Sequence, residues 1–268
     1  QWVQTMPLES LRPLTDKTLS FGLLNDVEQW TLLDPVYKAY TKDLCGYAER
    51  GEKEWKRLLG SFFAEGVNIA VVKNDEGQIE GYAVYRLGAP EIPVTEFVYT
   101  TRRAQRGLLN YFYNHRSQGE SIRWNEGLHD TGYRFVPDGK TGHTTMPYMM
   151  ARIVDVETAL TTVPVNPEAV MMPITLNIKV TDTLCDWNNG VFALSLGEST
   201  LPNVKRVSAE SVDEIDITID IGGLTVLLMG AVSAKDLVFE GKLQGESHWI
   251  DYLDMVYPKQ NTYINEWW

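Results

Sequence analysis

The chain has 268 residues, 44% of them hydrophobic and 22% charged, which is typical of a globular protein with a sizeable core. Its 24 Lys and Arg against 36 Asp and Glu give a net charge of −12, which disfavours a nucleic-acid partner. The two cysteines, Cys45 and Cys185, lie far apart in the sequence and exclude both a disulfide framework and a cysteine-rich zinc site.

The first half of the sequence predicts helices packed around a central mixed sheet. Helical spacing, a hairpin turn at 74–77 and apolar runs mark its elements. In chain order we expect a strand at 2–6, helices at 26–40 and 52–63, hairpin strands at 69–73 and 79–86, a strand at 94–99, a helix from Thr101, and strands at 121–124 and 146–154.

The start of the chain is unusual for a domain. The strand at 2–6 is followed at once by Pro7, Pro13 and a polar stretch. We therefore expect residues 1–15 to be the last strand and linker of a domain that precedes the chain. Residues 16–152 are expected to form the central domain.

The composition changes at 161–173, where three prolines interrupt any helical period. Strands are predicted at 174–180 and 191–196, and isoleucines alternate with polar residues over 215–221. Gly222 and Gly223 are expected to end that strand before a short apolar helix. A capping box at 233–236 and a last helix from Ser247 complete a second α+β domain, expected over 153–268.

No sequence motif by itself defines a reaction. The four histidines lack metal-ligand spacing, so no metal site is expected. The arginines at 102–106 are consistent with an anion site or with a solvated helix face. Asp182 and Asp186 are consistent with a cation site or with turn and capping roles.

The last two residues, Trp267 and Trp268, are both tryptophan. Two terminal indoles leave a large apolar surface in water unless they dock. A docked Trp268 would hold its α-carboxylate at a fixed point, where it could act as an anion or base. The alternative is that both indoles simply close a core or an interface.

The N-terminal residues show no basic segment followed by an apolar one, and the longest apolar run, 224–232, is too short to span a bilayer. Two unclustered thiols also suit a reducing compartment. We expect a cytoplasmic protein.

Five segments resemble the enhanced-intracellular-survival (Eis) family of bacterial acetyltransferases, and they follow the order of that family. The segments are GYAERGEKEW at 46–55, PYMMARIVDVETAL at 147–160, VTDTLCDWNNGVFAL at 180–194, DIGGLTVLLMG at 220–230, and the aromatic end at 261–268.

This resemblance implies an acetyl-CoA-dependent N-acetyltransferase of the GNAT class. The family has an N-terminal GNAT domain that binds acetyl-CoA, a central GNAT-like domain and a C-terminal domain similar to sterol carrier proteins. The chain then supplies the C-terminal two thirds of such an enzyme and lacks most of the first domain, so it is expected to be inactive alone.

The cofactor signature [Arg/Gln]-x-x-Gly-x-[Gly/Ala] is absent from residues 102–108. Without small residues there, backbone N–H groups do not close on a pyrophosphate. We therefore expect acetyl-CoA to bind the missing domain and not this chain.

The resemblance also assigns roles to the chain end. It implies that the α-carboxylate of Trp268 is the catalytic base and that Glu266 and Trp267 line the substrate channel, although packing alone also explains Trp267. It implies a small cationic amine as acceptor (an aminoglycoside, a polyamine or a lysine side chain) and a homo-oligomer, with no nucleic-acid or membrane partner. The tyrosine that serves as general acid in the family lies in the missing domain.

Two other functions remain open at this level. A lipid or sterol carrier could be built on the C-terminal domain, if its alternating isoleucines line a tunnel and not a filled core. A non-catalytic scaffold for oligomer assembly is compatible with the enzyme hypothesis.

Overall fold

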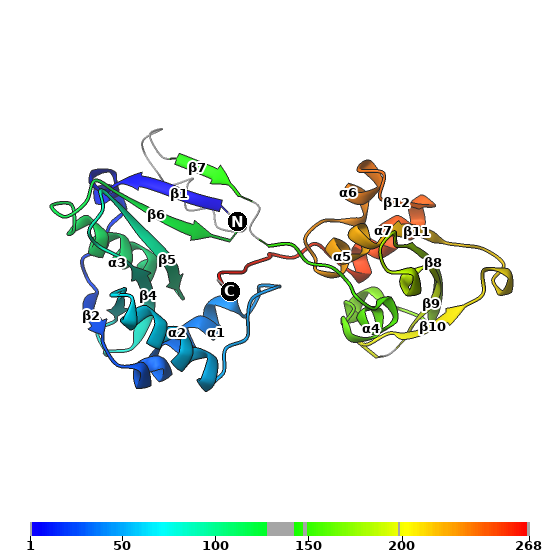
Figure 1. The fold of residues 1–268 in the computed structure, drawn as a ribbon, viewed down its shortest axis with the longest axis horizontal. Helices are drawn as coiled ribbons and strands as arrows, with labels where there is room; N and C mark the ends of the chain where they lie inside the picture. The colour runs from blue at the N-terminus through cyan, green and yellow to red at the C-terminus, as the bar shows by residue number, and fades with distance from the viewer. Residues whose placement is uncertain (1, 128–141, 147–148, 198, 267–268) are drawn as a thin grey trace. The chain divides into compact units, whose positions relative to one another are not determined.

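The computed structural model describes residues 2–127, 142–146, 149–197 and 199–266. The chain divides into two compact units (Figure 1): unit 1 comprises Gln1–Tyr148 and Thr262–Trp268, and unit 2 comprises Met149–Asn261. The final residues thus group with unit 1, although the sequence suggests a second domain that continues to residue 268. The boundaries expected at 15/16 and 152/153 stay predictions.

Unit 1 is built on a mixed sheet whose described strands follow the order β2-β3-β4-β5-β6-β1-β7. Neighbouring strands are antiparallel except β5 and β6, which are parallel. Its elements are β1 (Trp2–Pro7), η1 (Leu8–Leu14), β2 (Ser20–Leu24), η2 (Val27–Gln29), α1 (Trp30–Thr41), α2 (Glu52–Ala64), β3 (Asn68–Lys73), β4 (Ile79–Tyr85), β5 (Glu91–Tyr99), α3 (Arg102–Tyr113), β6 (Ser121–Glu126) and β7 (Gly142–Thr145).

Both faces of this sheet are covered. On β3, Ala70 and Val72 pack into a core with α3 and η1, whereas Ile69 and Val71 pack into a second core with α1 and α2. Side chains alternate between the faces of a strand, so a strand buried on both faces must be apolar throughout. This explains the unbroken run at 69–72 and gives unit 1 three layers.

The parallel pair β5 and β6 separates before either strand ends. Their register runs from Glu91 opposite Ser121 to Val94 opposite Trp124, while β5 continues to Tyr99. The register between β4 and β5 shifts at the same level, so that Thr95 is an extra residue in β5. Such a bulge bends the strand and leaves its backbone groups outside the ladder. Beyond Val94 and Trp124, β5 and β6 are no longer paired.

Strand β1 lies inside this sheet. It pairs with β6 over its whole length and with β7 over Trp2–Thr5. The strand expected at 2–6 is confirmed, and it contributes directly to unit 1. Its origin in a preceding domain stays a prediction.

Unit 2 holds a second mixed sheet of order β10-β9-β8-β11-β12, in which β8 and β11 are parallel. Its elements are α4 (Val156–Thr162), η4 (Pro167–Ala169), β8 (Ile174–Thr181), η5 (Asp186–Asn188), β9 (Gly190–Leu196), β10 (Asn203–Val207), η6 (Ala209–Ser211), β11 (Ile217–Asp220), α5 (Ile221–Leu228), α6 (Ala234–Phe239), β12 (Leu243–Gly245) and α7 (Ser247–Val256).

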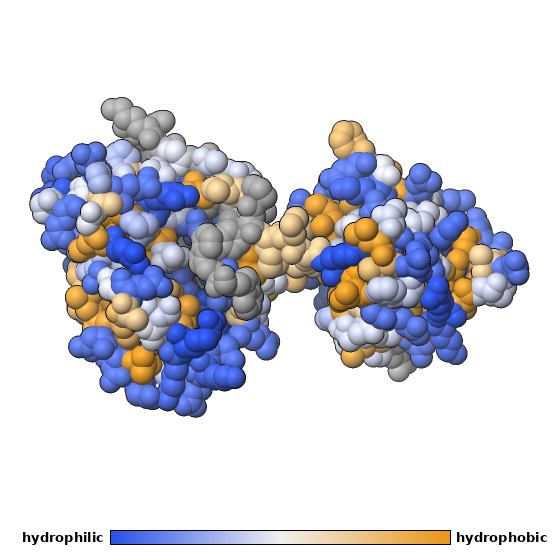
Figure 2. Space-filling model, in the orientation of Figure 1, coloured by the Kyte–Doolittle hydropathy of each residue, from blue (hydrophilic) through white to orange (hydrophobic). Residues whose placement is uncertain are grey.

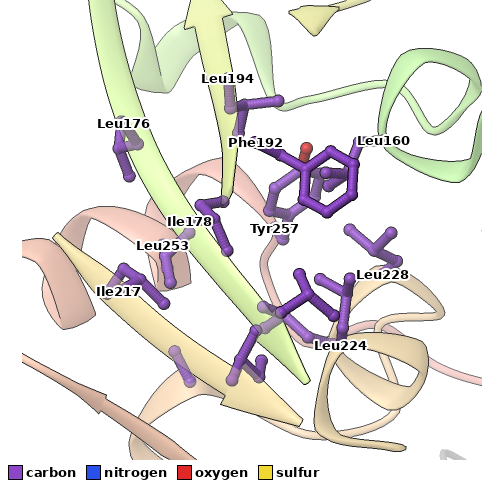
Figure 3. Close-up of a cluster of buried hydrophobic side chains, with 14 of the residues drawn as sticks. Leu160, Leu176, Ile178, Phe192, Leu194, Ile217, Leu224, Leu228, Leu253 and Tyr257 are labelled. Carbon is purple, nitrogen blue, oxygen red and sulfur yellow. The ribbon is translucent and has the colours of Figure 1, made fainter. Parts of the chain in front are cut away.

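The core of unit 2 is a filled apolar cluster. Figure 3 shows Ile178 of β8 and Phe192 of β9 facing Leu228 of α5, with Tyr257 among them. Ile217 and Ile219 belong to the same cluster, so the alternating isoleucines supply a core. The two α+β units confirm the fold class expected from the sequence.

Two sequence predictions need correction here. Gly222 and Gly223 do not end a strand, because Asp220 accepts the N–H of Gly223 at 2.6 Å and starts α5 before them. A side chain at Gly223 would crowd Ile219 and Lys242. The strand expected at 146–154 is also wrong in the described residues, since Met146 and 149–154 join no sheet.

On the face shown in Figure 2, hydrophilic residues surround scattered apolar ones in both units. Among the described residues, none of the helices combines the length and apolar character needed to cross a bilayer.

Candidate functional site

The centre of the candidate site is Arg50, a buried cation held between two aromatic rings. Its guanidinium carbon lies 4.2 Å from the ring centre of Tyr37 on α1 and 4.7 Å from that of Trp55 on α2. Each ring is itself tied down, because Tyr37 donates to the carbonyl of Ala48 and Trp55 to Asp34. Arg50 therefore has a fixed position before any anion is considered.

Glu96 on β5 is the first anion paired with Arg50. Nη1 and Nη2 of Arg50 donate to Oε2 and Oε1 of Glu96 at 3.2 and 2.5 Å. Tyr82 on β4 donates to Oε2 of Glu96 at 2.7 Å, and each of the two charged side chains is only 3% exposed. Such two-pronged pairing fixes direction as well as distance.

The second anion is Glu266, in the described end of the chain. Arg50 donates from Nε to Oε1 of Glu266 at 2.6 Å, and its Nη2 lies 2.5 Å from the same oxygen as an ion pair; the Glu266 side chain is 9% exposed. One guanidinium thus lies between two carboxylates, and these three groups carry a net charge of −1. The contact joins residues 216 positions apart in the sequence.

The residues before Glu266 also lie against unit 1. Thr262 forms a parallel bridge with Cys45, and the N–H of Tyr263 donates to the carbonyl of Cys45 at 2.9 Å. The Tyr263 ring is buried and meets Tyr40 edge to face, with ring centres 5.4 Å apart. In Figure 1 this segment lies beside α1.

Asn265 contacts β5 at the point where its pairing with β6 ends. Its amide nitrogen donates to the carbonyl of Thr95, the extra residue of β5. Oδ1 of Asn265 is buried and has no hydrogen-bond partner among the residues that the structure describes. We call residues 262–266 the docked tail.

The electrostatics keep these groups in defined states. Burial alone would lower the pKa of Arg50, but Glu96 and its neighbours outweigh this effect, and the pKa is raised above its usual value. Burial, then Glu96, raises the pKa of Tyr82, and burial raises that of Tyr263. Arg50 therefore stays cationic, and both tyrosines stay neutral.

Of the site residues expected from the sequence, Glu266 lies in this cluster, bound to Arg50. Trp267 and Trp268 lie outside the described residues, so their expected roles stay predictions. Sequence reasoning missed Glu96, Tyr82 and Thr95, which follow no motif. Arg50 and Trp55 did stand in the segment quoted for the family resemblance, without an assigned role.

The start of α3, where a GNAT cofactor site would lie, does not fit a pyrophosphate. Thr101 caps the helix by accepting the N–H of Ala104 at 3.0 Å and donates to the carboxylate of Glu80. Gly107 packs closely against Leu19, because a Cβ at position 107 would lie only 2.7 Å from the Leu19 side chain. The backbone donor of Ala104 is occupied and an anion already lies at this helix end, so phosphate oxygens are disfavoured.

The arginines of α3 bind neighbouring parts of unit 1. Arg106 donates to the carbonyl of Leu14 at 3.0 Å, and Arg103 donates to Thr18 at 3.0 Å and pairs with Asp75 at 3.5 Å. These contacts fix the segment between η1 and β2. They give no support to an anion site, whereas the exposed Arg102 and Arg106 are consistent with the solvated helix face.

In unit 2, Asp182 organises the loop after β8. It accepts the N–H groups of Leu184 and Cys185 at 2.9 and 3.1 Å, an amide N–H of Asn188 at 2.9 Å, and a contact from Arg152. Burial would raise the pKa of Asp182, but these donors outweigh it and lower the pKa well below its usual value. The turn role expected for Asp182 is the one observed.

In the part of the chain that the structure describes, no three His, Cys, Asp or Glu side chains lie close enough together to bind a metal ion. His129 lies outside that part. Both cysteines are free thiols.

Unit 2 contains a cavity of about 200 Å³, lined by the C-terminal ends of α5 and α7 and by residues that follow α4, α5 and α7. Small-molecule pockets occupy about 300–1,000 Å³. The cavity is therefore small for a lipid or sterol.

Comparisons with known proteins match two domain models. Residues 46–153 match the acetyltransferase (GNAT) domain, and residues 156–265 match the sterol carrier protein domain. A comparison with curated proteins found no match.

Solved structures share the fold of the chain. A conserved protein of unknown function from Enterococcus faecalis aligns with a TM-score of 0.85 and 22% identity over 100% of this chain and 66% of its own. A GCN5-related N-acetyltransferase from Anabaena variabilis aligns with a TM-score of 0.80 and 18% identity over 99% of this chain and 66% of its own. Eis1 from Mycobacterium abscessus aligns with a TM-score of 0.66 and 20% identity over 99% of this chain and 67% of its own.

The chain thus spans 66% of the length of the first two solved chains. At these identities the likeness establishes the fold. Together with the two domain matches, it shows that this chain contains a GNAT acetyltransferase domain followed by a sterol carrier protein-like domain.

Proposed function

We propose that the chain forms part of an Eis-like N-acetyltransferase and that it presents its own C-terminal carboxylate to an amine substrate. The observation that carries the proposal is the pairing of Glu266 with the buried, ring-held Arg50. A chain end that merely filled space would not need a buried charge pair, because burying two ions has a large desolvation cost.

Chain geometry supports this role for the terminus. Glu266 is followed by two residues, and two residues span at most about 7 Å. We propose that Glu266, over this short distance, serves as the anchor for the α-carboxylate of Trp268.

The chemistry expected of this carboxylate is modest. Amine substrates are protonated at neutral pH and must lose a proton before they form an amide. An α-carboxyl has an ordinary pKa near 3.5, which makes it a weak base for an ammonium group. We propose that it mainly orients the ammonium group and relays its proton to water.

The charge of the molecule suits a cationic acceptor such as an aminoglycoside, a polyamine or a lysine side chain. The net charge of the chain is −12, and the Arg50 cluster carries −1. A negative field raises the local concentration of cations. We propose that Glu266 contributes to this field while it serves as an anchor, and that the active protein is a homo-oligomer.

Acetyl-CoA supplies the acetyl group when it is bound, but the start of α3 does not suit its phosphates. Thr101 and Glu80 occupy that helix end. We propose that the cofactor binds a further GNAT-type domain and that the present chain alone does not transfer acetyl groups.

Removal of residues 267–268 from an enzyme that contains this chain tests the proposal. We expect kcat/KM for acetyl transfer to a panel of cationic amines to fall at least 100-fold, because general acid–base groups contribute about 10²–10⁴-fold. The urea midpoint of unfolding should stay the same. An unchanged kcat/KM would refute the role of the terminus.

The carrier function is less well supported. The core of unit 2 is filled by side chains, and its cavity measures about 200 Å³. No observation on the described residues favours the scaffold function over the enzyme.

A further inference from the structure

The docked tail belongs to unit 1 by its contacts, although the residues before it, Met149–Asn261, form unit 2. We infer that unit 1 is a receptor for this segment and that residues 262–266 bind to it as a separable peptide ligand, recognised at Glu266 by Arg50. The inference does not depend on the chemistry proposed for the terminal carboxylate.

The tail binds in the manner of an extended peptide. Tyr263 and Asn265 are buried, while Thr262, Ile264 and Glu266 are partly exposed, and burial of alternate residues is typical of an extended strand. Its backbone forms a bridge to Cys45 but joins neither sheet. Peptides that lie along protein edges use this combination of main-chain contacts and alternate side-chain sites.

Unit 1 recognises the tail through three distinct contacts. The Tyr263 ring packs on Tyr40, and Asn265 donates to the carbonyl of Thr95 at the bulge of β5. The carboxylate of Glu266 meets two nitrogens of Arg50. Unit 1 thus recognises an aromatic, an amide and a carboxylate side chain at fixed positions of the tail, which makes its binding sequence-specific.

The receptor is assembled without the tail. Tyr37 and Trp55 hold the guanidinium of Arg50, and Glu96, itself bound by Tyr82, neutralises its charge. All of these residues lie between positions 37 and 96. Because Arg50 keeps one buried counter-ion, loss of the tail does not leave an unpaired buried cation.

Two consequences follow. Glu266 is an anchor for the tail, so it is not expected to be a contact for substrate. The tail of one copy can also be replaced by that of another copy or by a free peptide of the same sequence.

The test uses the full chain with a protease site inserted between Asn261 and Thr262, next to an exposed residue. The chain is cleaved after folding, and a fluorescent peptide of residues 262–268 is titrated against it. We expect the cleaved chain to remain folded by circular dichroism and to exchange its tail for the labelled peptide.

The charge at position 266 provides the decisive comparison. A peptide with Glu266→Gln should bind at least tenfold more weakly, because truncating one partner of a buried pair weakens binding strongly. On a chain with Arg50→Met, the two peptides should bind equally. Arg86→Met is the matched control, since Arg86 pairs with Glu65 at the surface, and it should leave the tenfold preference intact.

Three results would overturn the inference. The cleaved chain could unfold, which would make the tail an integral part of the core. The labelled peptide could fail to exchange, or the native peptide and its Glu266→Gln variant could bind the unaltered receptor equally. Acetyl transfer is not measured, so failure here is distinguishable from failure of the proposed function.

Discussion

The two units each contain an arginine that contacts a buried aspartate or glutamate. The two arrangements differ in how far apart in the sequence the interacting residues lie. In unit 2, Asp182 takes its donors from Leu184, Cys185 and Asn188, within six residues, with Arg152 as the distant partner. In unit 1, Arg50 joins Glu96 and Glu266, 46 and 216 positions away.

This difference suggests a structural role for Asp182 and a candidate functional role for the Arg50 cluster. Backbone N–H groups around Asp182 need an acceptor wherever the loop is buried, so local folding alone explains that carboxylate. The fold of unit 1 does not require Glu266, because Arg50 is already paired with Glu96. We propose that the additional carboxylate, Glu266, holds the docked tail on unit 1.

The largest effect is expected for Arg50→Met. It leaves Glu96 and Glu266 buried without their cation, and breaking a buried pair typically costs about 3–5 kcal/mol. We expect this decrease in the free energy of unfolding to affect unit 1. Urea unfolding followed by hydrogen exchange in each unit measures it.

The surface pair Arg86–Glu65 is the control for that variant. Arg86→Met should change the free energy of unfolding by less than about 1 kcal/mol, because exposed pairs contribute little. Equal effects at positions 50 and 86 would contradict the role given to the buried cluster.

A smaller effect, confined to unit 2, is expected for Asp182→Asn. The pKa of Asp182 is lowered in the folded chain, so its stabilising contribution is present above the ordinary pKa of about 3.9 and is lost as the pH falls towards the folded value. The difference in unfolding free energy between the native chain and the variant should be constant from about pH 6 to 8 and shrink below about pH 4. A difference that grows in acid would refute this assignment.

The smallest effect is expected from acetyl-CoA on this chain. Saturating ligand at about 100 times its Kd stabilises a folded protein by about 2.7 kcal/mol. Since the start of α3 does not fit the phosphates, we expect no change in Tm. A rise of several degrees with acetyl-CoA would place the cofactor on unit 1 and contradict the roles assigned to Thr101 and Glu80.

Local patterns predicted much of the fold because the relevant interactions are close in sequence. The helix at 52–63 and the hairpin around 74–77 appear as α2, β3 and β4. The capping box of Ser233 and Asp236 is also confirmed. The short strand β12 carries no periodic signal over three residues, and it exists because β11 offers it an edge.

The candidate site was less predictable because its parts meet only after folding. Glu96 interrupts an apolar strand, and a buried carboxylate gives no sign in the sequence of the cation that neutralises it. Arg50 and Trp55 were noticed only through a family resemblance. The second cation–π contact of Arg50, with Tyr37 of α1, depends on the packing of α1 beside α2, which no local spacing determines.

Hydrogen exchange at the backbone N–H of Tyr263 tests the central claim most directly, because this group donates to the carbonyl of Cys45 in the docked tail. The account predicts slow exchange in the native chain and at least tenfold faster exchange in Glu266→Gln, with the strands of unit 1 equally protected in both. Exchange at the rate of a free peptide in the native chain would show that the tail is not held by unit 1.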